Sequence, residues 1–152
     1  MKFSTRQDTD LPADALFAAV SDFPRMERIL LRRGASLRRL DGQVEPGPGL
    51  AWQIGFDWRG KARELQLKVT SWQPPERLGF SGMSELFNIV LTATVVALSP
   101  GKSRLIFEAE VQPRGMKARL MLQTARLGKT QLDQKFALAV GDFIQKLAAD
   151  AA

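Results

Sequence analysis

The segment that decides the fold is the last long stretch of the sequence, PRGMKARLMLQTARLGKTQLDQKFALAVGDFIQKL, residues 113–147. Apolar or small residues recur in it at steps of three or four: Met121, Ala125, Gly128, Leu132, Phe136, Ala139, Phe143 and Leu147. This spacing puts them on one face of an α-helix. The segment therefore predicts one continuous helix of about 30 residues. Such a helix needs a large apolar surface to lie against.

The residues before this segment supply that surface, because their apolar pattern has a period of two. From residue 50 to residue 59, the even positions hold large apolar residues and the odd positions hold small or polar ones. The first set is Leu50, Trp52, Ile54, Phe56 and Trp58, and the second is Ala51, Gln53, Gly55, Asp57 and Arg59. Leu65, Leu67 and Val69 repeat the alternation. Strict alternation is typical of half-buried antiparallel strands. Further strands are expected around Leu78 and Phe80, over residues 86–98 and over residues 105–112, with Pro113 ending the last.

The beginning of the chain predicts one strand followed by two short helices. A first strand is expected from Lys2 to Thr9, followed by a short helix that starts near Pro12 and ends at Asp22. A second short helix follows and stops at Gly34. The whole pattern predicts one α+β domain, residues 1–152, with a helix-grip fold. In this fold a curved seven-stranded antiparallel sheet surrounds a long C-terminal helix, with two short helices after the first strand.

Two local stretches resemble a known superfamily. LPADALFAAVSDF (residues 11–23) is similar to its opening, where a proline-led helix ends in an Asp before the second helix. VTSWQPPERLGF (residues 69–80) is similar to its double-proline turn followed by Arg-Leu and an aromatic residue. With the order of elements, they resemble the START-related SRPBCC superfamily, which includes birch-pollen-allergen-like proteins, polyketide cyclases and coenzyme-Q-binding proteins. The resemblance implies a cavity between sheet and helix for an apolar or amphipathic molecule.

The composition excludes several kinds of chemistry. The 152 residues contain no Cys, His or Tyr. Disulfides, thiolate metal sites and cysteine nucleophiles are excluded, and so is the commonest general base. We therefore predict no metal site, no cofactor and no catalytic residue. The polar run after Phe3 is unlike a signal peptide, and no apolar stretch is long enough for a membrane helix, so the expected location is the cytoplasm.

Candidate ligand-binding residues are those that the patterns place on the inner face of the sheet or of the last helix: Trp52, Ile54, Phe56, Trp58, Arg63, Leu65, Leu67, Phe80, Phe107, Met121, Ala125, Gly128 and Leu132. The alternative is a filled core, which proteins build from the same residue types. Arg63 shares its parity with Leu65, so its guanidinium is a candidate for binding a carboxylate or quinone oxygen. Its alternative is a strand-end arginine whose head reaches water.

The net charge of +6 is concentrated in two segments, residues 25–39 and 114–149. In the first, Arg25, Arg28, Arg32 and Arg33 are candidates for binding an anionic membrane or an acidic protein. The alternative is a solvated surface that keeps the protein soluble. Nucleic acid is not expected as a partner, because exposed aromatic residues do not interleave with the basic ones.

These patterns predict binding or transport of a hydrophobic or amphipathic small molecule, such as a lipid, an isoprenoid, a quinone or a polyketide-like compound. The alternative is a polyketide cyclase or aromatase-like enzyme. The binding hypothesis is preferred, because the acid and base groups that an enzyme needs are predicted mostly on the outer face of the sheet.

Overall fold

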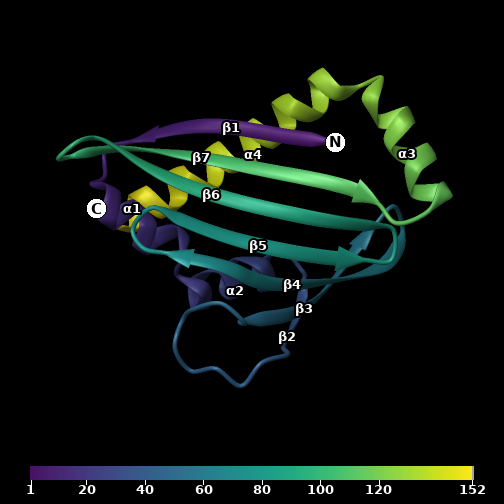
Figure 1. Cartoon of the computed structure of the whole chain (residues 1–152), viewed down its shortest axis with the longest axis horizontal. Helices are drawn as coiled ribbons and strands as arrows, with labels where there is room; N and C mark the ends of the chain where they lie inside the picture. Colours follow the sequence, from purple (N-terminus) through teal and green to yellow (C-terminus); the bar gives the residue numbers. More distant parts are fainter. Residues whose placement is uncertain (152) are drawn as a thin grey trace.

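The alternating segments form one antiparallel sheet of seven strands, in the order β1-β7-β6-β5-β4-β3-β2 (Figure 1). In the computed structural model, which describes residues 1–151 (side chains to Ala149), the strands are β1 (Lys2–Thr9), β2 (Ser36–Arg39), β3 (Ala51–Trp58), β4 (Lys61–Gln73), β5 (Arg77–Ser84), β6 (Phe87–Ser99) and β7 (Lys102–Pro113). Because consecutive strands from β2 to β7 are neighbours, most connections are hairpins. The predicted α+β helix-grip architecture is confirmed.

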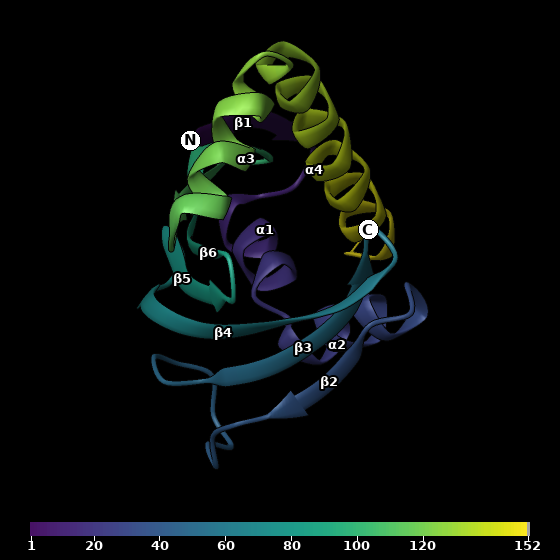
Figure 2. The same ribbon diagram turned by 90° about the vertical axis from the view of Figure 1, so that its right-hand side faces the viewer.

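Two short helices, α1 (Ala13–Val20) and α2 (Phe23–Arg32), connect β1 to β2. The side chain of Asp22 caps α2 by accepting a hydrogen bond from the backbone N–H of Arg25 at 3.2 Å. Pro24 stands in the first turn of α2, where its missing N–H costs nothing. The helices begin and end where the sequence predicts, and both lie on the concave side of the sheet (Figure 2).

The prediction of one continuous terminal helix was wrong, because the chain forms α3 (Met116–Arg126) and α4 (Lys129–Ala151). The N–H groups of Leu127 and Gly128 donate to carbonyls three residues back, at 3.2 and 3.0 Å, which closes α3 with a tight turn. Helix α3 packs on β7, whereas α4 packs on β1 and α1. The two helices meet at an apex away from the sheet (Figure 2). The sequence does not reveal this break, because the spacing of apolar residues by three or four continues from α3 into α4.

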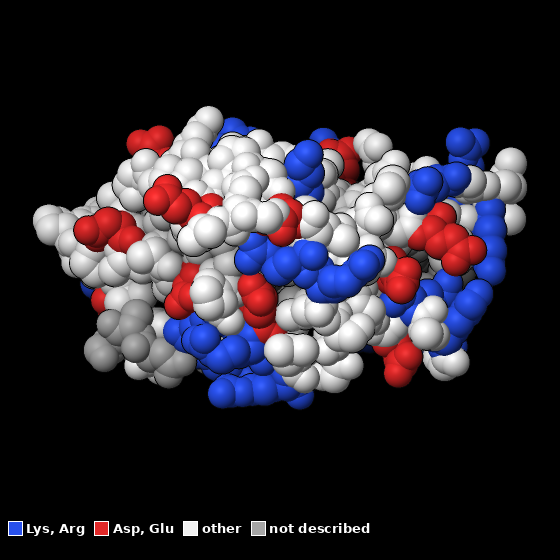
Figure 3. Space-filling model, turned by 90° about the horizontal axis from the view of Figure 1, so that it is seen from below, with Lys and Arg blue, Asp and Glu red and all other residues white. Residues whose placement is uncertain are grey.

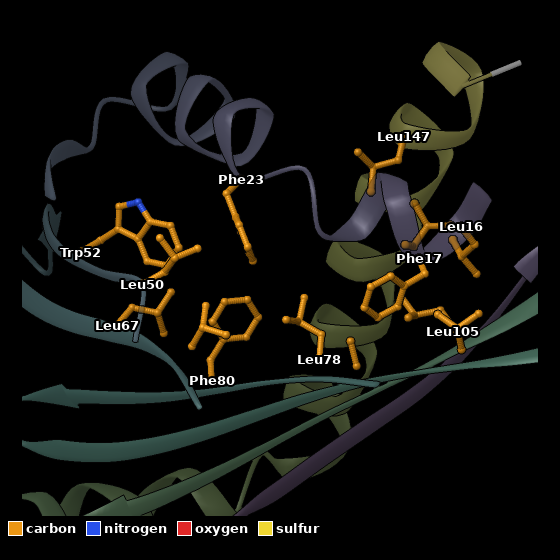
Figure 4. Close-up of a cluster of buried hydrophobic side chains, with 14 of the residues drawn as sticks. Leu16, Phe17, Phe23, Leu50, Trp52, Leu67, Leu78, Phe80, Leu105 and Leu147 are labelled. Atoms are coloured by element: carbon orange, nitrogen blue, oxygen red, sulfur yellow. The ribbon is translucent and has the colours of Figure 1, made fainter. Parts of the chain in front are cut away.

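The hydrophobic core lies at the end of the sheet that α1, α2 and the last turns of α4 cover (Figure 4). Phe23 projects from α2 between Trp52 and Phe80, with ring centroids 5.4 and 6.2 Å away. Leu16 and Leu147 bring α1 and α4 into the same cluster, and both are fully buried. The side chains of this cluster are therefore closed off from solvent.

No helix in the described part of the chain is both long and apolar enough to cross a membrane.

Candidate functional site

A cavity of about 680 Å³ lies at the other end of the sheet, where the β3–β4 hairpin meets the β5–β6 turn. The register Phe56↔Arg63, Leu65↔Ser84 and Gly82↔Ile89 shows which lining residues share the concave face. These are Phe56, Trp58, Arg63, Leu65, Ser84, Phe87 and Ile89. The rest of the lining comes from residues of opposite parity, the β5–β6 turn and the end of β7: Gln53, Ala62, Glu64, Gln66, Met83, Glu85, Leu86 and Arg114.

The concave face of β3 passes from solid packing to open space along its length. Trp52 and Ile54 are 0% and 7% exposed, whereas Phe56 and Trp58, two and four residues further, are 37% and 38% exposed. All four side chains project to the same face, because alternate residues of a strand do. The strand therefore continues past the end of the core and carries two aromatic side chains into the cavity.

Gly82 lets two cavity-lining side chains, Leu65 and Ile89, come together on the concave face. A Cβ atom at this buried position would lie 3.2 Å from Cδ1 of Leu65 and 3.6 Å from Cβ of Ile89. With hydrogen in its place, the two flanking side chains approach each other across β5. The wall that they form is apolar, as the body of a hydrophobic ligand requires.

Arg63 is the one polar group of the concave wall with an unsatisfied donor. Its Nε–H is buried and has no hydrogen-bond partner among the described residues. Its guanidinium carbon lies 5.5 Å from the centre of the Trp58 ring, and that of Arg59 lies 4.7 Å from the same ring. Leaving a buried donor unpaired costs about 1–3 kcal/mol, so a side-chain arrangement that gives this N–H an acceptor oxygen would be favoured.

The charges around the cavity balance one another. Arg63 and Arg114 are opposed by Glu64 and Glu85, so the lining has a formal charge of zero. Arg114 donates through Nη1 to the carbonyl of Ser84, and Glu64 accepts from the side chain of Gln53 at 3.0 Å. The cavity consequently combines an apolar wall with a small number of fixed polar groups, a pattern typical of small-molecule sites.

Four of the residues proposed from the sequence come together in this cavity: Phe56, Trp58, Arg63 and Leu65. Four others, Trp52, Ile54, Leu67 and Phe80, are buried in the core and do not line it. Phe107 is half-buried against Phe136 of α4, with centroids 5.8 Å apart. Met121 and Ala125 of α3, Gly128 at the break and Leu132 of α4 are half-buried and lie outside its lining.

Sequence reasoning missed the lining contributed by the β5–β6 turn and by Arg114. Ile89 has the parity of Ala93, a core residue on the same strand, and this signal would have identified it. Ser84 and Glu85 lie beyond the strand expected at Leu78 and Phe80, because β5 runs further than predicted. Arg114 follows Pro113, and its backbone N–H donates to the carbonyl of Leu86 at 2.9 Å. Nothing local predicts that contact.

The arginines of α2 lie at a different place. Arg25, Arg28 and Arg32 border a smaller hollow of about 380 Å³ together with Lys146 of α4, while Arg33 does not line it. Arg25 donates through Nη2 to the carbonyl of Lys146 at 3.1 Å. Figure 3 shows basic side chains gathered in this region and, separately, at the end of the molecule that carries the β3–β4 hairpin.

Two ion pairs outside the cavity shift the pKa values of their members. Hydrogen bonds from Arg104 lower the pKa of Asp8, and those from Arg39 lower the pKa of Asp41. Asp41 also accepts from the backbone N–H groups of Gln43 and Ala51, both at 2.8 Å. Within the described residues, no three acidic side chains gather in a way that would hold a metal ion.

Comparison with known proteins gives one match at the level of sequence families. Residues 1–139 match the model described as polyketide cyclase / dehydrase and lipid transport. No curated protein matches the sequence.

Solved structures match the fold over nearly the whole chain. The Zhui aromatase/cyclase of Streptomyces sp. R1128 is 11% identical with a TM-score of 0.71, and the match covers 99% of this chain and 93% of that one. Norcoclaurine synthase of Thalictrum flavum is 13% identical with a TM-score of 0.69, covering 99% and 87%. A START superfamily protein of Mycobacterium smegmatis is 14% identical with a TM-score of 0.55, covering 88% and 95%. The likeness to these structures shows a shared fold, and the family match over residues 1–139 confirms the predicted superfamily.

Proposed function

Because this chain belongs to the polyketide cyclase / dehydrase and lipid transport family, we propose that it binds a hydrophobic small molecule with one polar end in the cavity between β3 and β6. The observation that carries the proposal is the unpartnered, buried Nε–H of Arg63 in a concave wall made mostly of apolar residues. A volume of about 680 Å³ is within the usual range of ligand sites, roughly 300–1,000 Å³.

The lining also indicates the polar end of the ligand. Two arginines and two glutamates surround the cavity, so no excess positive charge is available for a phosphate. The Nε–H of Arg63 fits a single acceptor oxygen, such as a quinone or ketone carbonyl or one oxygen of a carboxylate. The half-exposed rings of Phe56 and Trp58 supply flat apolar surface for the rest of the molecule. An isoprenoid quinone, a fatty acid and a polyketide all meet this description.

Native mass spectrometry of the purified protein tests the proposal. We expect a reproducible small-molecule adduct from cell extract, whose identity follows from extraction and fragmentation. Arg63→Met is expected to reduce adduct occupancy at least tenfold. Arg59→Met is the matched control, because Arg59 contacts the same Trp58 ring and does not line the cavity. The proposal fails if no adduct forms, or if the two variants lose it equally.

A second candidate is a cyclase or dehydrase acting on the bound molecule. The observation that favours it is the carboxylate of Glu85 in the same lining as Arg63. A carboxylate beside a carbonyl polarised by arginine is able to take a proton from the adjacent carbon. Under this alternative, the extracted compound changes in mass or absorption during incubation with the protein. Glu85→Gln abolishes that change without displacing the compound. Recovery of the compound unaltered leaves the carrier function.

A further inference from the structure

Helix α3 has two apolar faces, and only one of them packs on the protein. Ala118 is buried, and Met121, Leu122 and Ala125 on the same side are half-buried. On the other side, Met116, Leu120 and Leu127 are 67%, 55% and 91% exposed. Their spacing of four and seven residues aligns them along the helix. An exposed apolar row of this kind is characteristic of an interaction surface.

The charges around this row specify its partner. Lys117 and Arg119 are exposed on α3, as is Arg126 one residue before Leu127. From Arg114 to Leu132 the sequence has five basic residues and no acidic one: Arg114, Lys117, Arg119, Arg126 and Lys129. A helix with an apolar row beside basic residues and no acidic ones matches the interface of an anionic lipid bilayer. A protein partner of mixed charge would not require so one-sided a composition.

The position of α3 leaves this row accessible. In Figure 1, α3 projects beyond the ends of β6 and β7, and it packs on β7 through its other face. The row therefore lies at an extremity of the molecule, away from α2 and its arginines. A flat surface is able to reach it without meeting the rest of the sheet first.

We propose that α3 docks this protein on anionic lipid bilayers, with Met116, Leu120 and Leu127 entering the interface and Lys117, Arg119 and Arg126 contacting the lipid head groups. Arg114, which lines the cavity, lies two residues before α3. Docking therefore brings the cavity close to the bilayer. The docking itself does not depend on a ligand, so it is tested separately from ligand binding.

The absence of cysteine from the chain gives a direct probe. Leu120→Cys accepts a single environment-sensitive fluorophore on the exposed row. Leu31→Cys is its matched control, since Leu31 on α2 is 54% exposed and Leu120 is 55% exposed. With vesicles of phosphatidylcholine and phosphatidylglycerol at low salt, we expect a blue shift of the label at position 120 and none at position 31. A shift at position 31 alone, or at neither position, overturns the proposal.

Vesicle sedimentation separates the contribution of α3 charges from that of net charge. One double variant, Lys117→Gln with Arg119→Gln, removes two positive charges from α3. The other, Arg28→Gln with Arg32→Gln, removes two positive charges from α2. We expect the first pair to weaken binding to anionic vesicles at least tenfold and the second to leave it within twofold. If the α2 pair causes the larger loss, the arginines of α2 are the docking surface and the α3 proposal is wrong. Dimerisation that Leu120→Gln abolishes in the absence of lipid would also refute it, because a second copy would then cover the row.

Discussion

Trp52 and Trp58 lie six residues apart on the same face of one strand and have different surroundings. Trp52 is fully buried, its ring lies 5.4 Å from that of Phe23, and its indole N–H donates to Glu27 at 3.4 Å. Trp58 is 38% exposed at the cavity, in contact with two arginines. The first tryptophan is part of the core, whereas the second is available to a ligand.

We therefore expect Trp52→Ala to act mainly on stability and Trp58→Ala mainly on ligand binding. Loss of the buried indole lowers the free energy of unfolding by about 3–5 kcal/mol. Loss of the half-exposed one costs less than about 1.5 kcal/mol and reduces ligand occupancy in native mass spectra. Urea denaturation of both variants measures the difference. Equal losses of stability would mean that the two ends of β3 are packed alike.

The carboxylate of Asp41 links the stability of the fold to pH. Arg39 and two backbone N–H groups hold its carboxylate and lower its pKa. Because the pKa is lower in the folded protein than in the unfolded chain, the carboxylate stabilises the fold fully above its unfolded pKa of about 3.9. This stabilisation is lost as the pH falls from there toward the folded pKa.

Asp41→Asn is accordingly expected to make stability less sensitive to acid. Between pH 5 and pH 2.5, the wild type should lose more unfolding free energy than the variant, as measured by urea denaturation at both values. Asp10→Asn is the control, because the side chain of Asp10 is 92% exposed. An acid sensitivity that is the same in the wild type and in Asp41→Asn would exclude this ion pair as its source.

At the scale of elements, the residues that were predicted correctly are those whose neighbours on the chain determine their conformation. Alternation fixes the faces of β3 and β4, and Asp22 and Pro24 fix the start of α2. The break at Leu127 and Gly128 was not predictable in this way. It follows from the different surfaces on which α3 and α4 pack, and both helices keep one apolar period. Gly141 is a second position that depends on contacts far along the chain. A Cβ atom there would lie 3.3 Å from the side chain of Gln7 on β1, and the residues next to Gly141 do not reveal this approach.

The conformation of Gly128, at the break between α3 and α4, leads to a prediction about its replacement. Gly128 does not have the left-handed conformation, and a Cβ atom there would lie 3.9 Å from the carbonyl oxygen of Ala125. Gly128→Ala is therefore expected to stabilise the protein by about 0.4–1 kcal/mol, since alanine restricts the unfolded chain. Gly34, with a φ of +90° after α2, is the control, and alanine there should cost about 1–2 kcal/mol. Thermal unfolding of both variants checks the signs, and destabilisation at both positions would show that the break itself requires glycine.

For the whole molecule, the sheet extends beyond the helices and the hydrophobic core on its concave face. Helices α1, α2 and the end of α4 cover one end, while the hairpin ends of β3–β6 line the open cavity. Sequence patterns assign residues to the concave face and do not show how far the helices extend along it. For this reason Trp52 and Phe56 were indistinguishable before the structure, and the contribution of Arg114 to the cavity came from folding at long range.

The most direct test of the cavity compares two substitutions on one face of β6. Ile89 lines the cavity and is half-buried, whereas Val95, six residues further on the same face, is 5% exposed in the core. Native mass spectrometry and urea denaturation of Ile89→Trp should show no bound molecule and a stability at least equal to that of the wild type. Val95→Trp should cost about 1–3 kcal/mol by overpacking and keep the adduct. A full adduct in Ile89→Trp, or a loss of stability matching that of Val95→Trp, would contradict a ligand cavity at this end of the sheet.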